Sequence, residues 1–109
     1  MQFKLKDALP FGWDGLKGWA YNSKNDFANA SAAYVEIDGA HGSVKSTKSD
    51  LVYFVLEGSG EFILDGKNIK VEKMDTIIVP KNTPFNYQGK MKLFLVHCPA
   101  YEETAEIKC

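Results

Sequence analysis

The stretch Leu51-Val-Tyr-Phe-Val-Leu-Glu-Gly-Ser-Gly-Glu-Phe-Ile-Leu-Asp-Gly-Lys67 decides the fold. Its first six residues are apolar or aromatic and rich in β-branched and ring side chains, which is typical of a buried strand. The segment 57–60 contains two glycines and predicts a turn, after which 61–64 resumes as a strand. Asp65-Gly66 is a strong hairpin-turn dipeptide. The stretch therefore predicts an antiparallel meander with which the rest of the chain must pair.

Short strands separated by turn residues are expected on both sides of this meander. They comprise an edge strand within Met1–Pro10 that contains Phe3 and Leu5, then 31–38, 43–48, 68–71, 76–79, 85–87 and 91–98. Met74-Asp75 and 88–90 are expected turns. The segment 11–19 is too rich in glycine for a helix, and Trp13 and Trp19 are expected to anchor it to the domain or to a second subunit. This pattern predicts an all-β sandwich or barrel.

Length and composition predict one domain and narrow the classes of partner. The chain has 109 residues and a net charge of −1, and its lysines never form a basic run, so no nucleic-acid or anionic-membrane surface is expected. Residues 1–10 lack the apolar core of a signal peptide, and no apolar run is long enough to span a bilayer. Cys98 and Cys109 form neither a disulfide framework nor a CxxC motif. We expect a reduced, cytoplasmic protein.

Two spaced motifs carry a resemblance to a known family. Gly39 is followed by Lys45, Thr47, Leu51 and Gly58 at the spacing of a glycine, two histidines, a glutamate and a glycine. Farther on, Met74, Pro80, Asn82, Phe85 and Gly89 stand at the positions of a second motif, in which Phe85 replaces a histidine. With these spacings the chain resembles the cupin family over roughly residues 31 to 98.

The resemblance implies a fold and a division of the chain. The expected fold is a double-stranded β-helix, the jelly-roll cupin barrel. Residues 1–30 would form an N-terminal arm and edge strand of the same domain, and 31–98 the barrel core. Residues 99–109 would form a polar tail that is either a short helix or disordered.

The residues at the family's metal-ligand positions predict that the usual metal site is absent from this chain. In metal cupins the four motif positions supply histidine and glutamate ligands, whereas here they hold Lys45, Thr47, Leu51 and Phe85. These side chains offer at most one weak hydroxyl donor to a transition metal. We therefore expect no metal, no other cofactor, and no metal-dependent cupin chemistry.

The candidate ligand-binding residues follow from the motif positions and from strand alternation. They are Lys45, Thr47, Leu51, Tyr53, Phe85 and Tyr87. Lys45 is either a lysine at the barrel mouth whose ammonium reaches water, or a cation that binds an anionic ligand. His41 is expected on the surface in a glycine-flanked turn, and His97 as a hydrogen-bonded core residue.

Three functions remain open at this point. The first is a metal-independent module that binds a small molecule, and the positive charge of Lys45 favours an anionic one. The second is a metal-free isomerase or lyase acting on a small carboxylate or sugar-like substrate, with Lys45 or Tyr53 as acid or base. The third is a structural or assembly role with a vestigial pocket. A homodimer to which the N-terminal third contributes is expected, because Trp13 and Trp19 are typical of interface centres.

Overall fold

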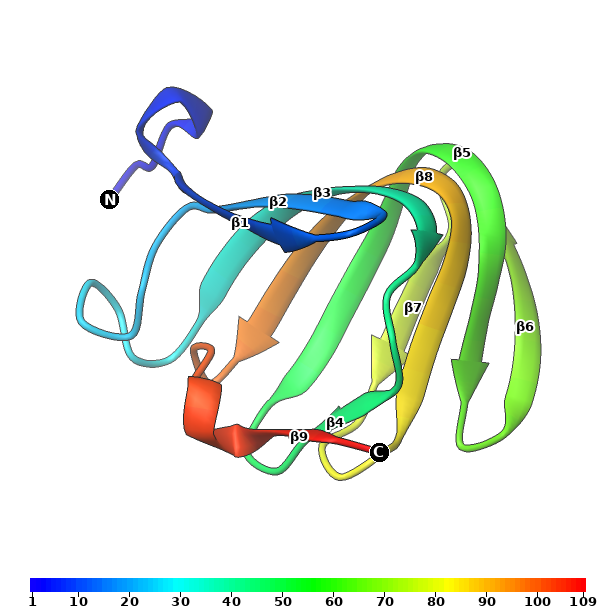
Figure 1. Cartoon of the computed structure of the whole chain (residues 1–109). Coiled ribbons are helices and arrows are strands. Elements are labelled where there is room, and N and C mark those ends of the chain that lie inside the picture. The colour runs from blue at the N-terminus through cyan, green and yellow to red at the C-terminus, as the bar shows by residue number, and fades with distance from the viewer.

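The computed structural model covers residues 1–109, and β-strands are its main secondary structure (Figure 1). The strands are β1 (Leu9–Trp13), β2 (Leu16–Ala20), β3 (Ser31–Ala40), β4 (Val44–Ser46), β5 (Asp50–Leu64), β6 (Lys67–Glu72), β7 (Thr76–Val79), β8 (Phe85–Cys98) and β9 (Glu106–Lys108). Two 3₁₀ turns, Leu5–Asp7 and Glu103–Ala105, are the helical elements. No helix is long and apolar enough to cross a membrane.

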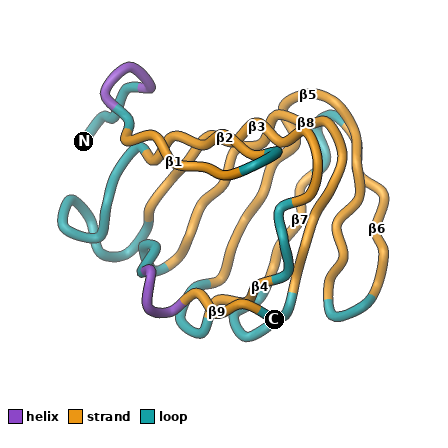
Figure 2. Tube along the Cα trace, viewed as in Figure 1, coloured by secondary structure: helices purple, strands orange, loops and turns teal.

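All strand pairs are antiparallel and belong to one sheet that curls on itself (Figure 2). One path runs β1-β2-β3-β8-β4-β9, and β5 adds to it by pairing with β6, β7 and β8. The long strands β5 and β8 lie side by side over almost their whole length. The first half of β5 and the second half of β8 form one wall with β1, β2, β3 and β7. The remaining halves form the opposite wall with β4, β6 and β9, which confirms the predicted all-β barrel.

Two of the predicted turns are wrong, because the chain bends there without reversing. The segment 57–60 lies inside the 15-residue strand β5, where a bulge between Val55 and Glu57 and a positive φ of 84° at Gly58 change its direction. The segment 88–90 lies inside the 14-residue strand β8, with φ of 132° at Gly89. Glycines occur both at tight turns and at bends within a continuous strand, so their presence in the sequence does not distinguish the two.

The bend of the sheet passes through three glycines on adjacent strands. Gly89 of β8 lies opposite Gly39 of β3 on one side and Gly60 of β5 on the other. A Cβ on Gly89 would lie 2.7 Å from the Gly60 Cα and 2.7 Å from the Ser59 carbonyl oxygen, so the backbones approach too closely for any side chain. The three glycines let adjacent strands approach closely along the line where the sheet bends.

Several local predictions are confirmed. Asp65 and Gly66 have φ of 48° and 82° and form the β5–β6 hairpin turn. Met74 reverses the chain with φ of 77° before β7, whose bounds match the predicted strand. Along β3, residues 33, 35 and 37 are buried while Tyr34 and Glu36 face outward.

The two ends of the chain differ from expectation. The predicted edge strand around Phe3 and Leu5 is a 3₁₀ turn, and the first strand runs instead from Leu9 to Trp13, through Pro10. The segment 11–19 lies within the β1–β2 hairpin, where Trp13 and Trp19 contact the domain as predicted. The tail adds strand β9 to β4, because its backbone groups find partners along that short strand.

The hydrophobic core lies between the two walls. Away from the bend, side chains along the long strands alternate between the inside and the outside of the barrel, and most of the inward ones are almost fully buried. The core consists of Leu16, Ala33, Val35, Ile37, Leu51, Tyr53, Val55, Phe62, Val71, Val79, Phe85, Tyr87, Met91, Leu93 and Leu95. Its aromatic members gather toward the wall that contains β4 and β9, and this end of the interior holds the candidate site.

Candidate functional site

Four aromatic side chains form a cluster inside the barrel. Tyr53 and Phe62 come from β5, Phe85 and Tyr87 from β8, and all are at most 2% exposed. The Tyr53 ring lies 5.1 Å from Phe62 and 5.2 Å from Tyr87, both edge-on, while Phe62 and Tyr87 stack at 4.8 Å between ring centroids. Leu51 is also buried. The predicted inward orientation of Leu51, Tyr53, Phe85 and Tyr87 is confirmed, and their role in ligand binding stays a prediction.

His41 belongs to this cluster, so the prediction of a surface histidine is wrong. It follows β3, and its backbone N–H donates to the Tyr87 carbonyl at 2.8 Å, which fixes the turn against β8. Its ring stacks on Tyr87 at 4.6 Å and on Phe85 at 5.6 Å between centroids. The flanking glycines indicated a solvated turn, but the hydrogen bond to β8 folds the imidazole over the barrel interior.

The imidazole of His41 is held in one tautomer. Its Nδ1 lies 2.7 Å from the Gly42 carbonyl oxygen and must be the protonated nitrogen, because a carbonyl only accepts. No group of the protein hydrogen-bonds to Nε2. Because every buried side-chain nitrogen has a partner, this unpaired nitrogen is accessible rather than buried. Burial lowers the pKa of His41 below its ordinary 6.5, and the bond to Gly42 opposes this only in part. His41 therefore presents a neutral imidazole with Nε2 able to accept a proton.

The two buried tyrosines remain protonated. Burial raises the pKa of Tyr53 well above 10.0, and the neighbouring Tyr87 raises it further. Burial also raises the pKa of Tyr87, although interaction with Tyr53 partly lowers it. Both phenols are therefore hydrogen-bond donors at any physiological pH.

Glu106 adds a carboxylate to the same end of the interior. It lies opposite Ser46 in the β4–β9 pair, and Ser46 is only 7% exposed, so both side chains face inward. Burial raises the pKa of Glu106, while the Tyr101 hydroxyl, which donates to Oε2 at 3.4 Å, lowers it. Its negative charge in turn raises the pKa of both Tyr53 and Tyr87. Sequence reasoning missed Glu106, because nothing in a polar tail signals that it will pair with β4.

Lys45 and Thr47 do not join the cluster, and their predicted inward orientation is wrong. On β4 the inward residues are Val44, which packs on the core, and the buried Ser46. Lys45 lies opposite Ile107, which is 44% exposed, on the outer side, and the Thr47 hydroxyl donates to the Ala105 carbonyl at 3.2 Å. On β4 the inward positions are therefore shifted by one residue from the predicted ones, and a shift of one residue reverses every side chain of a strand.

The inner face of β1 extends the aromatic surface toward solvent. Phe11 and Trp13 are 40% and 50% exposed, and they lie opposite Gly18 and Leu16, which face the interior. The Trp13 Nε1–H donates to the His41 carbonyl at 3.2 Å, and the two rings meet edge-on at 5.4 Å. A continuous series of rings thus runs from exposed Phe11 to buried Tyr53.

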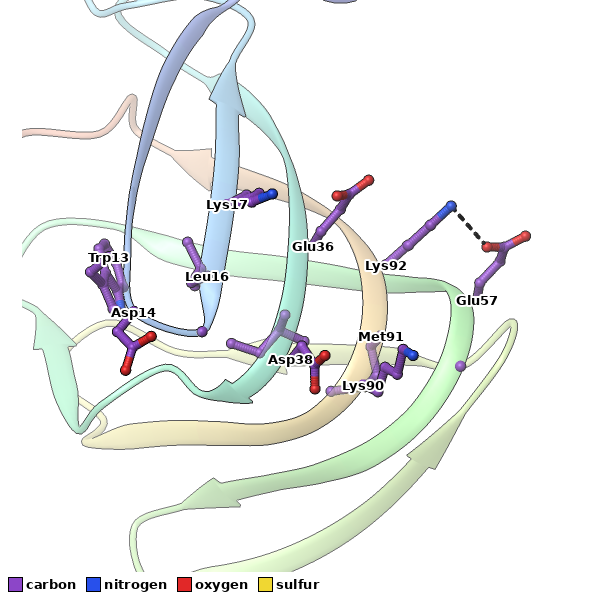
Figure 3. Close-up of a pocket in the computed structure, with 13 residues that line it drawn as sticks. Trp13, Asp14, Leu16, Lys17, Glu36, Asp38, Glu57, Lys90, Met91 and Lys92 are labelled. Carbon is purple, nitrogen blue, oxygen red and sulfur yellow. Dashed lines mark ion pairs between the residues drawn. The ribbon is translucent and has the colours of Figure 1, made fainter.

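A groove of about 770 Å³ opens at the bend of the sheet (Figure 3). Seven of its 13 lining residues are charged, and Trp13, which lines the groove, contacts His41 edge-on. No group of three or more His, Cys, Asp or Glu side chains is placed to hold a metal ion. Six of the seven charged side chains are exposed to solvent, whereas the aromatic side chains beside His41 and Glu106 are buried, and we take this cluster as the candidate site.

His97 lies outside this site and makes a prediction about stability. Burial lowers its pKa to about 4, and its ring meets Tyr101 edge-on at 5.3 Å. The unfolded chain binds the proton near pH 6.5 and the folded chain only near pH 4, so stability is present above pH 6.5 and falls as the pH drops toward 4. We expect a loss of about 2–3 kcal/mol from this residue.

The measurement is urea unfolding of the native protein and of His97→Gln at about pH 7 and about pH 4.5. The variant should lose about 2 kcal/mol less than the native protein between the two conditions. Equal losses would show that folding does not lower the pKa of His97.

The site combines a neutral base, two weak acids and a partly buried carboxylate. A neutral imidazole can take a proton from a carbon acid. Buried phenols can stabilise a developing oxyanion or protonate a leaving oxygen, and they do so best where water is excluded. The arrangement suits proton transfer and elimination.

No family model matches the chain. Among curated proteins, the uncharacterized protein MJ1618 of Methanocaldococcus jannaschii is 35% identical over 68 residues, which are 58% of this chain and 54% of that protein. The chain therefore spans about half the length of this curated relative.

Solved structures share the whole fold. Pac13, described as a unique nucleoside dehydratase, has a TM-score of 0.89 and 25% identity, over 97% of this chain and 88% of that protein. Three variants of the Streptomyces protein, at 24% identity, were solved with uridine; one replaces a histidine and two replace tyrosines. KdgF from Halomonas sp. has a TM-score of 0.79 at 15% identity, over 94% of this chain and 96% of that one. A Bacillus subtilis oxalate decarboxylase has a TM-score of 0.84 at 14% identity, over 98% of this chain and 32% of that one.

Proposed function

Because the chain has the cupin fold, we propose that it uses the barrel interior as a metal-independent lyase that removes water from a nucleoside-like substrate. The observation that carries the proposal is the His41 imidazole, held neutral with Nε2 free and stacked on protonated Tyr87, which in turn contacts protonated Tyr53. The likeness to a nucleoside dehydratase supports the substrate class. Its uridine-bound variants alter one histidine and two tyrosines, the residue types gathered here.

The reaction needs a substrate with a carbonyl next to the C–H that is removed, since an unactivated sugar C–H is too weak an acid for imidazole. Nε2 of His41 takes this proton, and the electron pair moves onto the carbonyl oxygen. The pair then returns to form a carbon–carbon double bond as the C–O bond to the β-hydroxyl breaks. A tyrosine hydroxyl protonates the leaving oxygen, which departs as water. The step consumes no oxidant or reductant.

Other side chains would hold the substrate. Phe11 and Trp13 offer ring faces to a planar base, and Trp13 lies against His41. Glu106 provides an acceptor for sugar hydroxyls inside the barrel. Lys45 and Thr47 have no part in this proposal because they lie on the outer side of β4, and the preference for an anionic ligand that rested on Lys45 is dropped with them.

The experiment uses protein dialysed against EDTA. Binding of uridine is followed by calorimetry, and uridine oxidised to the 5′-aldehyde is assayed for loss of one water by mass spectrometry. Binding with water loss supports the lyase. Binding of both probes without water loss would favour a metal-independent binding module, and failure to bind either would favour a structural role. Activity that disappears with EDTA and returns with a divalent metal would overturn metal independence.

The pH profile gives a second test of the same site. Because its pKa is lowered, His41 becomes protonated and stops acting as a base only below pH 6.5. Because their pKa values are raised, the two tyrosines lose their protons and stop acting as acids only above pH 10.0. We expect kcat/KM to stay level between about pH 6.5 and about pH 10 and to fall only outside this range. An acid limb at or above pH 6.5 would contradict the lowered pKa of His41.

A further inference from the structure

The two outer faces of the barrel differ in composition. On the wall formed by β2, β3, β5, β7 and β8, one cross-strand row consists of Trp19, Tyr34, Phe94 and Phe54. These side chains are half-buried, and Trp19 stacks on Tyr34 at 5.5 Å. The next row contains Val96, Val52 and Ile78, of which Val52 is 37% and Ile78 61% exposed. We call these two rows the outer aromatic face.

The outer face of the opposite wall carries different residue types. There the outward row of β8, β5 and β6 consists of Gln88, Glu61 and Lys70. Contiguous apolar patches are uncommon on monomeric proteins, whereas this row of the opposite wall is polar. The aromatic rows therefore need an explanation beyond the fold itself.

A row of charges borders the outer aromatic face. Lys17, Glu36, Lys92 and Glu57 are cross-strand neighbours in this order, and all project from the same side of the sheet (Figure 3). Lys92 Nζ lies 3.3 Å from Glu57 Oε2, and the Tyr34 hydroxyl donates to Glu36 Oε2 at 2.8 Å. The signs alternate along the row as plus, minus, plus, minus.

We propose that the outer aromatic face is the interface of a homodimer with a two-fold axis parallel to the strands. Such an axis sets the charged row against its own reversed copy. Lys17 then faces Glu57 of a second identical chain, and Glu36 faces Lys92, so every position meets the opposite sign. The aromatic rows meet each other at the same time. A two-fold interface must be self-complementary, and a row of four alternating charges satisfies this condition.

The test reverses charges in sets and measures assembly by sedimentation equilibrium of the full chain. Lys17→Glu with Lys92→Glu makes the row uniformly negative, and Glu36→Lys with Glu57→Lys makes it uniformly positive. Each double variant should dimerise at least about tenfold more weakly than the native chain. An equimolar mixture of the two should form a heterodimer, and the quadruple variant, whose row alternates again, should regain the native affinity.

Two further variants guard against a change of fold or of net charge alone. Lys67→Glu with Lys70→Glu makes the same charge change away from this face and should dimerise like the native protein. Ile78→Lys places a charge at the most exposed position of the aromatic rows and should favour the monomer. A native chain that is monomeric at about 100 µM would overturn the proposal. Double variants that dimerise as tightly as the native chain would also overturn it, and would place the interface elsewhere, for example on β1.

Discussion

His41→Gln is expected to lower kcat for water elimination by about 10²- to 10⁴-fold, the range for removal of a general base. Glutamine keeps a polar side chain of similar reach, but it cannot take up a proton. KM should change little, because the base acts mainly in the transition state. The measurement is steady-state kinetics with the oxidised uridine probe, with calorimetry to confirm that uridine still binds.

The matched control is His97→Gln, which changes the other histidine of the chain in the same way. His97 lies against Tyr101 rather than within the aromatic cluster, so its kcat should stay near the native value. A His41→Gln enzyme within tenfold of the native kcat would refute the assignment of the base. Loss of uridine binding with unchanged turnover per bound substrate would make His41 a binding residue instead.

Gly89→Ala is expected to destabilise the fold by about 3–5 kcal/mol, which combines backbone strain with overpacking. The new Cβ would stand 2.7 Å from the backbone of Gly60 and Ser59, and the φ of 132° is one that alanine rarely adopts. Small domains have about 5–15 kcal/mol of stability in all, so the variant should melt far below the native protein. Thermal unfolding followed by circular dichroism measures the effect.

Gly66→Ala separates the two contributions. Gly66 also has a positive φ, of 82°, but a Cβ there would meet nothing within 4 Å. This variant should cost about 1 kcal/mol, from backbone strain alone. Equal losses in the two variants would mean that the contact between β5 and β8 at the bend tolerates a side chain.

The fold could be predicted to the level of architecture because strand signals are local. Residues 76–79 and the Asp65-Gly66 turn were placed correctly, since β-branched runs and turn dipeptides act within a few residues. The segments 57–60 and 88–90 were not, because a glycine does not reveal whether the chain reverses or bends. That choice depends on a contact between strands distant in sequence, as at Gly60 and Gly89.

The candidate site was predicted in part, for a related reason. Tyr53 and Tyr87 lie on long strands whose alternation is unambiguous, and both face inward. The short strand β4 carries no such signal, so Lys45 and Thr47 were assigned to the wrong side. His41 and Glu106 enter the interior through single backbone pairings, with Tyr87 and with Ser46. No residue pattern near His41 or Glu106 predicts these pairings.

The continuity of β5 and β8 through the bend restricts how the molecule can move. A barrel built from two separate sheets could open like a clamshell, whereas here two unbroken strands cross from one wall to the other and tie them together. Beside the candidate site, the edges of the sheet are the easiest places to widen, since β1 pairs only with β2 and β9 only with β4. Such margins are where local unfolding costs least free energy. Phe11 and Trp13 lie on one margin and Glu106 on the other, so the residues proposed to grip a substrate are also those that must yield to admit it.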